Sequence, residues 1–166
     1  ETLAGGAAHG KSMMMIDIGT MAPDVSFDLA DGSRSSLAAW RGKLLVLYFY
    51  PKDDTPGCTN EAKAFSALRP EFAKAGVAVL GVSKDSVKSH AKFIAKYDLQ
   101  VALAADTDGS VCEAFGVWVE KSMYGKTYLG IERATFLIDA QGRIEQVWRK
   151  VKVLGHAEAV LAAAGS

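Results

Sequence analysis

The chain of 166 residues has only two cysteines, Cys58 and Cys112, and its formal net charge is zero. So few cysteines exclude a disulfide-stapled scaffold and favour a reducing compartment, so we expect a cytoplasmic protein. The basic residues are scattered and offset by acids, which gives no support for nucleic-acid binding. No run of about 18 apolar residues is present, so the sequence predicts no membrane-spanning helix and no membrane partner.

Histidine is also scarce. His9, His90 and His156 are far apart in the sequence and show none of the short spacings that metal-binding histidines share. The sequence therefore predicts no metal site, and we interpret all three histidines as exposed surface residues.

One apparent nucleotide motif lies in residues 5–12, whose sequence GGAAHGKS satisfies the pattern of a phosphate-binding loop. That loop works only between a strand and a helix, and the flanking segments show neither pattern. We therefore expect no nucleotide. The small residues and the methionine run of residues 1–15 are interpreted as the remnant of an artificial leader or a disordered tail. Residues 16–166 are long enough for one hydrophobic core, so we expect a single domain there.

The most informative segment that is present leads from a strand through a cysteine into a helix. Residues 44–50 are all apolar or aromatic, which is typical of a buried strand, and Pro51, Pro56 and Gly57 then end it in a turn. Residues 59–75 carry apolar side chains at helical spacing, so we expect one helix there. Cys58 is thereby predicted at the N-terminus of a helix.

This position favours reactivity, because the free N–H groups and the positive end of the helix dipole stabilise a thiolate, the nucleophilic form of cysteine. The alternative is a small apolar packing residue. The turn around Cys58 favours the reactive interpretation, since Thr55 can direct a hydroxyl towards a molecule that approaches the sulfur. Pro51 can shield the sulfur without offering a competing N–H.

Most of the remaining segments are expected to alternate between strands and helices. Residues 25–30 and the turn at Asp31 and Gly32 suggest a short hairpin, and residues 36–40 a helical turn. Further strands are expected at residues 43–50, 77–82, 101–104, 133–138 and 144–151, and helices at 86–97 and 155–164. The strands at 133–138 and 144–151 flank a short turn and should form an antiparallel hairpin. This order is typical of an α/β, thioredoxin-like fold in which helices flank a central mixed sheet.

Two separated motifs give this chain a family resemblance. The run YPKDDTPGCT at 50–59 and the run RATFLID at 133–139 resemble the peroxiredoxins, and FGVW at 115–118 and GKTY at 125–128 are similar to the Q, or bacterioferritin comigratory protein, subfamily. The resemblance covers roughly residues 18–164. It implies an antioxidant enzyme, a thiol peroxidase that reduces hydrogen peroxide and organic hydroperoxides as a monomer, with no metal and no organic cofactor.

The resemblance also implies roles for individual residues. Cys58 would attack the peroxide and become a sulfenic acid, and Thr55 with the backbone N–H of Cys58 would bind the peroxide. Arg133 would hold the thiolate and the developing charge, and Pro51 would shield the sulfur. On local grounds alone, Thr55 and Arg133 are ordinary turn and strand residues.

The sequence departs from the subfamily at the step that regenerates the thiol. Many members carry a second cysteine five residues after the first, and Lys63 occupies that position here. Cys112 is either a possible resolving cysteine or a buried packing residue. We expect an external thioredoxin- or glutathione-type thiol to act as reductant. The alternative function is a redox sensor or thiol-dependent binding protein that Cys58 oxidation switches.

Overall fold

The computed structural model describes residues 16–165. The predictions for residues 1–15, the GGAAHGKS segment and His9 therefore lie outside the described residues. Within them, the apolar segment after Lys43 forms β3 (Leu44–Phe49), the strand next to the catalytic turn predicted above. The prediction of one domain over residues 16–166 stays a prediction.

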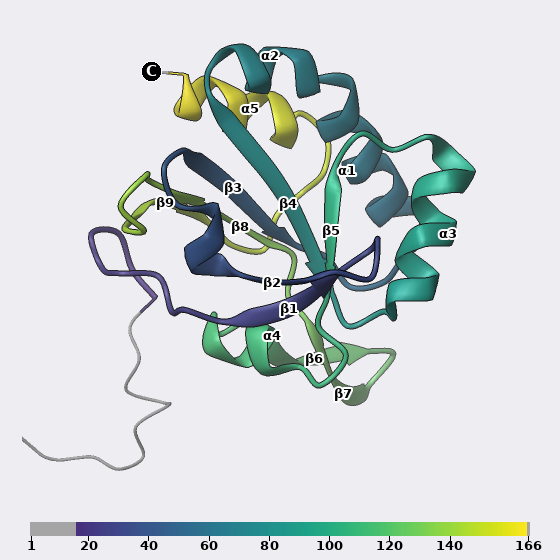
Figure 1. Cartoon of the computed structure of the whole chain (residues 1–166). Helices are drawn as coiled ribbons and strands as arrows, with labels where there is room; N and C mark the ends of the chain where they lie inside the picture. Colours follow the sequence, from purple (N-terminus) through teal and green to yellow (C-terminus); the bar gives the residue numbers. More distant parts are fainter. Residues whose placement is uncertain (1–15, 166) are drawn as a thin grey trace, which may run out of the picture.

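The main sheet has seven strands in the order β2-β1-β5-β4-β3-β8-β9 (Figure 1). Strand β3 pairs in parallel with β4 and antiparallel with β8, so the sheet is mixed, as predicted. The other strands of this sheet are β1 (Ser26–Leu29), β2 (Arg34–Ser36), β4 (Val77–Ser83), β5 (Ala102–Ala105), β8 (Ala134–Ile138) and β9 (Ile144–Trp148).

Helices cover both faces of the sheet. They are η2 (Leu37–Trp40), α1 (Pro56–Ala67), α2 (Arg69–Lys74), α3 (Val87–Tyr97), α4 (Ser110–Ala114) and α5 (His156–Ala164). Alternate residues of β3 point to opposite faces, which creates two hydrophobic cores. One core joins Val46 and Tyr48 to α1, α2, α3 and α5, and the other joins Leu45 and Leu47 to η2 and α4.

The prediction of one continuous helix over residues 59–75 was wrong. The segment forms α1 and α2, which are separated at Leu68. Pro70 explains the break, because proline has no N–H to donate to the preceding turn and its ring clashes with the carbonyl four residues earlier. Proline is tolerated in the first turn of a helix, and Pro70 is the second residue of α2. The first helix also begins earlier than predicted, at Pro56.

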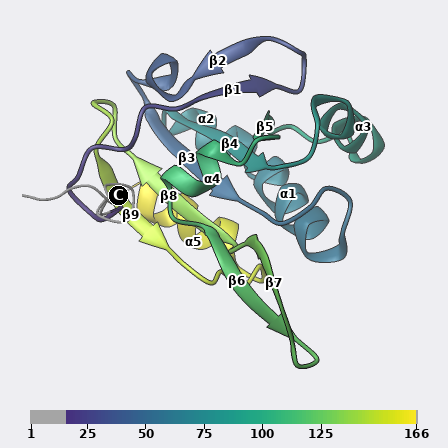
Figure 2. The same cartoon turned by 90° about the horizontal axis from the view of Figure 1, so that it is seen from below.

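One hairpin was not predicted. Strands β6 (Trp118–Met123) and β7 (Lys126–Ile131) form a separate antiparallel pair that extends from the body of the molecule (Figure 2). Tyr124 and Gly125 connect them with φ values of 53° and 80°, the left-handed geometry of a tight hairpin turn. Among residues 16–165, no helix is long and apolar enough to cross a membrane.

Candidate active site

Cys58 is the third residue of α1, in the turn that follows β3. Thr55 is the N-cap of this helix, and the N–H of Thr59 donates to the carbonyl oxygen of Thr55 at 2.8 Å. The N–H groups of Gly57 and Cys58 precede this first helical bond and therefore face out of the open helix end. Cys58 is a free thiol and only 1% exposed. The sulfur is thus placed where local backbone dipoles favour a negative charge.

Arg133 reaches Cys58 from a different part of the sheet. Phe49 of β3 pairs with Ala134 of β8, so Arg133 lies beside the end of β3, where the turn to Cys58 begins. Its Nη2 lies 3.5 Å from the Sγ of Cys58. Gly57 leaves space for this contact, because a Cβ there would lie 3.1 Å from Nη2 of Arg133. The structure therefore brings a fixed positive charge against the sulfur.

Glu61 completes this arrangement, and it was not predicted as a site residue. Its Oε1 accepts from Nη1 of Arg133 at 2.7 Å, and its side chain is 1% exposed. Burial raises the pKa of Glu61 to about 7, against the opposing effect of Arg133. Its Oε2 is buried without a hydrogen-bond partner. The spacing of three residues from Cys58, which places both on one helix face, was the available signal.

Thr55 and Pro51 lie in the same loop, and both are half-buried. The hydroxyl of Thr55 donates to the carbonyl oxygen of Lys52 at 2.8 Å. Because its proton is used in this way, the oxygen of Thr55 is left with lone pairs that can accept from a ligand O–H. Pro51 follows β3 directly and offers no N–H to compete for the sulfur.

Cys112 is not brought to this site. It lies in the hydrophobic core on the opposite face of the sheet from Cys58. Its backbone N–H donates to Oδ2 of Asp106 at 2.8 Å. Burial, followed by the hydrogen bond and the negative charge of Asp106, raises the pKa of the Cys112 thiol well above its ordinary range.

The interpretation of the histidines as surface residues was wrong for His90 and His156, which are both buried. The Nε2 of His156 lies 2.8 Å from the Oγ1 of Thr135 in β8. Burial, with a smaller contribution from Arg133, lowers the pKa of His156 to about 4, so it is neutral at physiological pH. Both residues come from helices whose apolar sides face the sheet, which residue type alone does not reveal.

His90 lies near two acids, Asp53 and Asp85, and the potential ligand atoms of the three lie within 4.8 Å of one another. Each of them already has a protein partner. His90 Nδ1 lies 2.8 Å from Asp53 Oδ2, and Asp85 Oδ2 accepts from Ser83 and from the backbone N–H of Asp53. A cation would have to displace these hydrogen bonds, so the donor set does not fit a metal ion as it stands.

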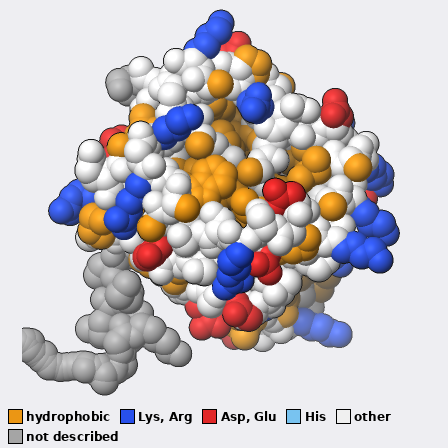
Figure 3. Space-filling view, in the orientation of Figure 1, with side chains coloured by type: hydrophobic (Ala, Val, Ile, Leu, Met, Phe, Trp, Pro, Cys, Tyr) orange, Lys and Arg blue, Asp and Glu red, His pale blue; other side chains and the backbone are white. Residues whose placement is uncertain are grey.

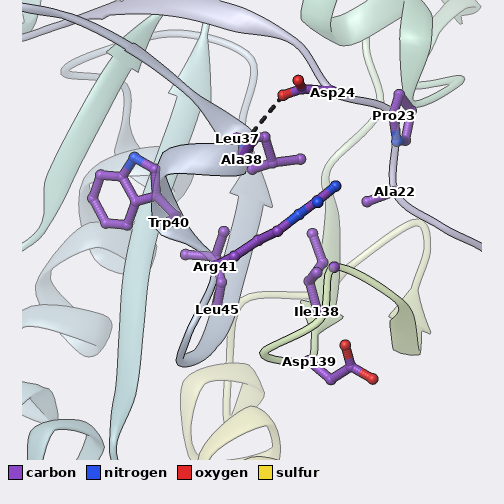
Figure 4. A pocket seen from close by; sticks show the side chains of 11 residues that line it. Ala22, Pro23, Asp24, Leu37, Ala38, Trp40, Arg41, Leu45, Ile138 and Asp139 are labelled. Atoms are coloured by element: carbon purple, nitrogen blue, oxygen red, sulfur yellow. Dashed lines mark hydrogen bonds between the residues drawn. The ribbon is translucent and has the colours of Figure 1, made fainter.

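Two hollows elsewhere on the surface do not include Cys58. One, between Asp24, Arg41 and Ile138, holds only about 10 Å³, which is about the space of one water molecule (Figure 4). The other, of about 340 Å³, is lined by side chains that include Trp40 and Arg69. Figure 3 shows hydrophobic side chains gathered near the centre of one face, with charged side chains around them. Neither hollow contains a cysteine.

Comparisons with known proteins agree with this geometry. A model of the AhpC/TSA family matches residues 18–147. The peroxiredoxin Bcp of Xanthomonas campestris pv. campestris is 56% identical over 140 residues, which cover 84% of this chain and 88% of that protein. The peroxiredoxin Bcp of Bacillus subtilis is 48% identical over 143 residues, covering 86% and 91%.

A solved structure is also similar to this chain in sequence and fold. It comes from work on the alkyl peroxide reduction activity of the Xanthomonas campestris bacterioferritin comigratory protein, with trapped intermediate and ligand complexes. Its sequence is 55% identical, the TM-score is 0.81, and the match covers 84% of this chain and 89% of that one.

Proposed function

This chain belongs to the AhpC/TSA family and, within it, to the Q or Bcp group of peroxiredoxins, and from this we propose how its own residues reduce peroxides. The predicted thiol-dependent peroxidase function and thioredoxin-like fold are confirmed. A peroxide is therefore its substrate and a thiol its reductant. The roles of single residues, the identity of the reductant and the oligomeric state are our proposals.

In the proposed first step, the Cys58 thiolate attacks the terminal oxygen of the peroxide. An S–O bond forms as the O–O bond breaks, so the sulfur is oxidised and the peroxide is reduced. The remaining oxygen leaves as an alkoxide or hydroxide and takes up a proton, which yields an alcohol or water. The observation that carries this proposal is the position of Arg133 Nη2, 3.5 Å from Sγ at the open end of α1.

The neighbouring groups act on charge and orientation. Arg133 stabilises the thiolate and then the negative charge that moves onto the leaving oxygen. The Thr55 oxygen accepts the O–H of the peroxide, and the N–H of Cys58 donates to a peroxide oxygen. Pro51 keeps water and backbone donors away from the sulfur. Glu61 orients Arg133 through the hydrogen bond at 2.7 Å.

For the second step we propose an external thiol of the thioredoxin or glutathione type. The thiol condenses with the sulfenic acid, releasing water and forming a mixed disulfide, and a second thiol then frees Cys58. The sheet between Cys58 and Cys112 supports this one-cysteine cycle, because a disulfide requires Cα atoms within about 7 Å. Peptide mapping under non-reducing conditions after peroxide treatment tests it, and a dominant Cys58–Cys112 linkage would contradict it.

Steady-state peroxide consumption in the presence of a thiol reductant tests the catalytic proposal. An enzyme consumes many equivalents of peroxide, whereas a redox sensor would consume one equivalent and stop. We also propose that the protein is a monomer in the cytoplasm. Light scattering coupled to size-exclusion chromatography tests the oligomeric state, and fractionation of the source cells tests the location.

A further inference from the structure

A buried hydrogen-bonded pair, Asp53 and His90, anchors the active-site loop. Asp53 belongs to the loop between β3 and α1, and His90 belongs to α3. Their side chains are 4% and 0% exposed, and His90 Nδ1 lies 2.8 Å from Asp53 Oδ2. Tyr50 donates its hydroxyl to Asp53 Oδ1 at 2.6 Å, and Ser89 donates to Oδ2 at 2.8 Å. The side chain of Asp53 thus has three partners, and it is almost fully buried.

Both ring nitrogens of His90 are used in this arrangement. Its Nε2 lies 2.9 Å from the carbonyl oxygen of Ala104, which can only accept, so Nε2 carries a proton. Its Nδ1 lies 2.8 Å from Oδ2 of Asp53 and 3.4 Å from the hydroxyl oxygen of Tyr50. Buried polar side chains with partners on every side are held in one orientation, because a lost hydrogen bond there is costly.

The pair ties the loop to α3 and the segment before it. The backbone N–H of Asp53 donates to Oδ2 of Asp85, so both the side chain and the main chain of Asp53 are held. The same loop contains Thr55, two residues further along. A second link, between Asp54 and Lys96 of α3, is exposed to solvent, with side chains that are 40% and 59% exposed. Exposed ion pairs of this kind contribute little to the stability of a fold.

We propose that Asp53 and His90 are positioning residues for peroxide reduction, which rests on the peroxidase mechanism above. Neither residue touches the sulfur. The pair holds residues 51–55 so that the Thr55 oxygen lies where the peroxide binds. Reaction of Cys58 with an alkylating agent needs the thiolate, and Arg133 supplies its stabilisation from elsewhere. Loss of the pair therefore slows reaction with peroxide far more than alkylation.

The test compares two second-order rate constants of Cys58, one with hydrogen peroxide and one with iodoacetamide. For Asp53→Ala we expect the peroxide rate to fall by about tenfold to a hundredfold, the loss that a displacement of about 1 Å can cause, with alkylation little changed. Asp53→Asn should restore most of the peroxide rate, because its amide can donate to Nδ1 of His90. Lys96→Ala is the matched control, and it should resemble the wild type in both reactions.

Equal losses in both reactions, or no loss in Asp53→Ala, would overturn the positioning role. If the wild type itself does not consume peroxide, the proposed mechanism fails instead, so the two failures are distinguishable. If Asp53→Ala does not fold, Ser89→Ala removes one donor to Asp53 and should lower the peroxide rate selectively by about two- to threefold, as loss of one modest hydrogen bond does. An equal loss in both reactions of Ser89→Ala, or no loss in the peroxide rate, also overturns the proposal.

Discussion

Cys58 and Cys112 occupy the same position in two different helices. Each is the third residue of its helix, each is a free thiol, and each is at most 1% exposed. The difference is the charge beside them. Arg133 lies 3.5 Å from the sulfur of Cys58, whereas Asp106 accepts the backbone N–H of Cys112. A cation at one helix end favours a thiolate, and an anion at the other opposes it.

The comparison shows that a helix N-terminus does not by itself make a cysteine reactive. At α4 the carboxylate of Asp106 already takes up the first N–H groups, from Val111 at 3.0 Å and from Cys112 at 2.8 Å. At α1 the corresponding N–H groups are free to face a ligand. The group that occupies the helix end therefore decides between a packing cysteine and a nucleophile.

The largest predicted difference concerns the loss of each sulfur. Cys58→Ser should abolish peroxide turnover and leave the fold intact, because a serine can occupy the helix N-terminus equally well. Cys112→Ser should keep its turnover with an external thiol. Peroxide loss measures activity, and circular dichroism checks the fold. Activity above a few percent in Cys58→Ser would refute the assignment of the nucleophile.

The outcome for Cys112 also tests the cycle. Loss of thioredoxin-supported turnover in Cys112→Ser, with over-oxidation of Cys58 to sulfinic acid, would identify Cys112 as the resolving residue. That result would require local unfolding, because the sheet separates the two cysteines.

Removal of the positive charge of Arg133 should make Cys58 less reactive, and in this respect more like Cys112. Arg133→Met keeps much of the side-chain volume but loses the charge, so we expect slower peroxide reduction by on the order of 2 to 4 kcal/mol, or roughly 30- to 1,000-fold. Alkylation of Cys58 at a fixed pH should also slow, since the thiolate has lost its positively charged partner. Unchanged alkylation would mean that Arg133 does not stabilise the thiolate. Arg149→Met, at an exposed pair with Glu132, is a control.

The raised pKa of Glu61 predicts how the stability of the protein depends on pH. The pKa of Glu61 is about 7 in the folded protein and 4.5 as its ordinary value. Between these values the native state binds more protons than the unfolded state, so stability falls as pH rises from about 4.5 to 7. The full loss is about 3 kcal/mol, and it should be absent in Glu61→Gln.

Urea unfolding of both proteins at pH 5 and pH 8 measures this difference. The wild type should lose stability relative to Glu61→Gln between the two pH values. A constant difference would show that Glu61 keeps an ordinary pKa in the folded state.

The smallest predicted effect is at the other cysteine. Asp106→Asn removes the anion from the N-terminus of α4, so the pKa of Cys112 should fall, but it should remain raised because burial is its main cause. The helix should lose about 1 kcal/mol of stability through the weaker cap. Urea unfolding of both proteins measures this loss. An unchanged free energy of unfolding would mean that Asp106 does not cap α4.

The local elements were largely predictable because their signals are local. Apolar runs and turn residues located β3, β4, α3 and the β8–β9 hairpin within a few residues. The hairpin of β6 and β7 was missed because its strands are mostly exposed and lack an apolar run. The break at Leu68 could have been predicted from Pro70, since a proline there interrupts helical hydrogen bonding.

The sequence by itself determined that Cys58 stands at the start of a helix after a buried strand, and its motifs identified Arg133 as the residue to meet it. Only the tertiary structure decided what surrounds the sulfur. The contact between Cys58 and Arg133 joins residues 75 positions apart, and it depends on the pairing of β3 with β8. The burial of Glu61, the pairing of Asp53 with His90, and the placement of Cys112 across the sheet depend in the same way on packing. The propensity of a segment to form a helix or strand depends on neighbouring residues. The electrostatic environment of a side chain depends on chain segments that meet only when the protein folds.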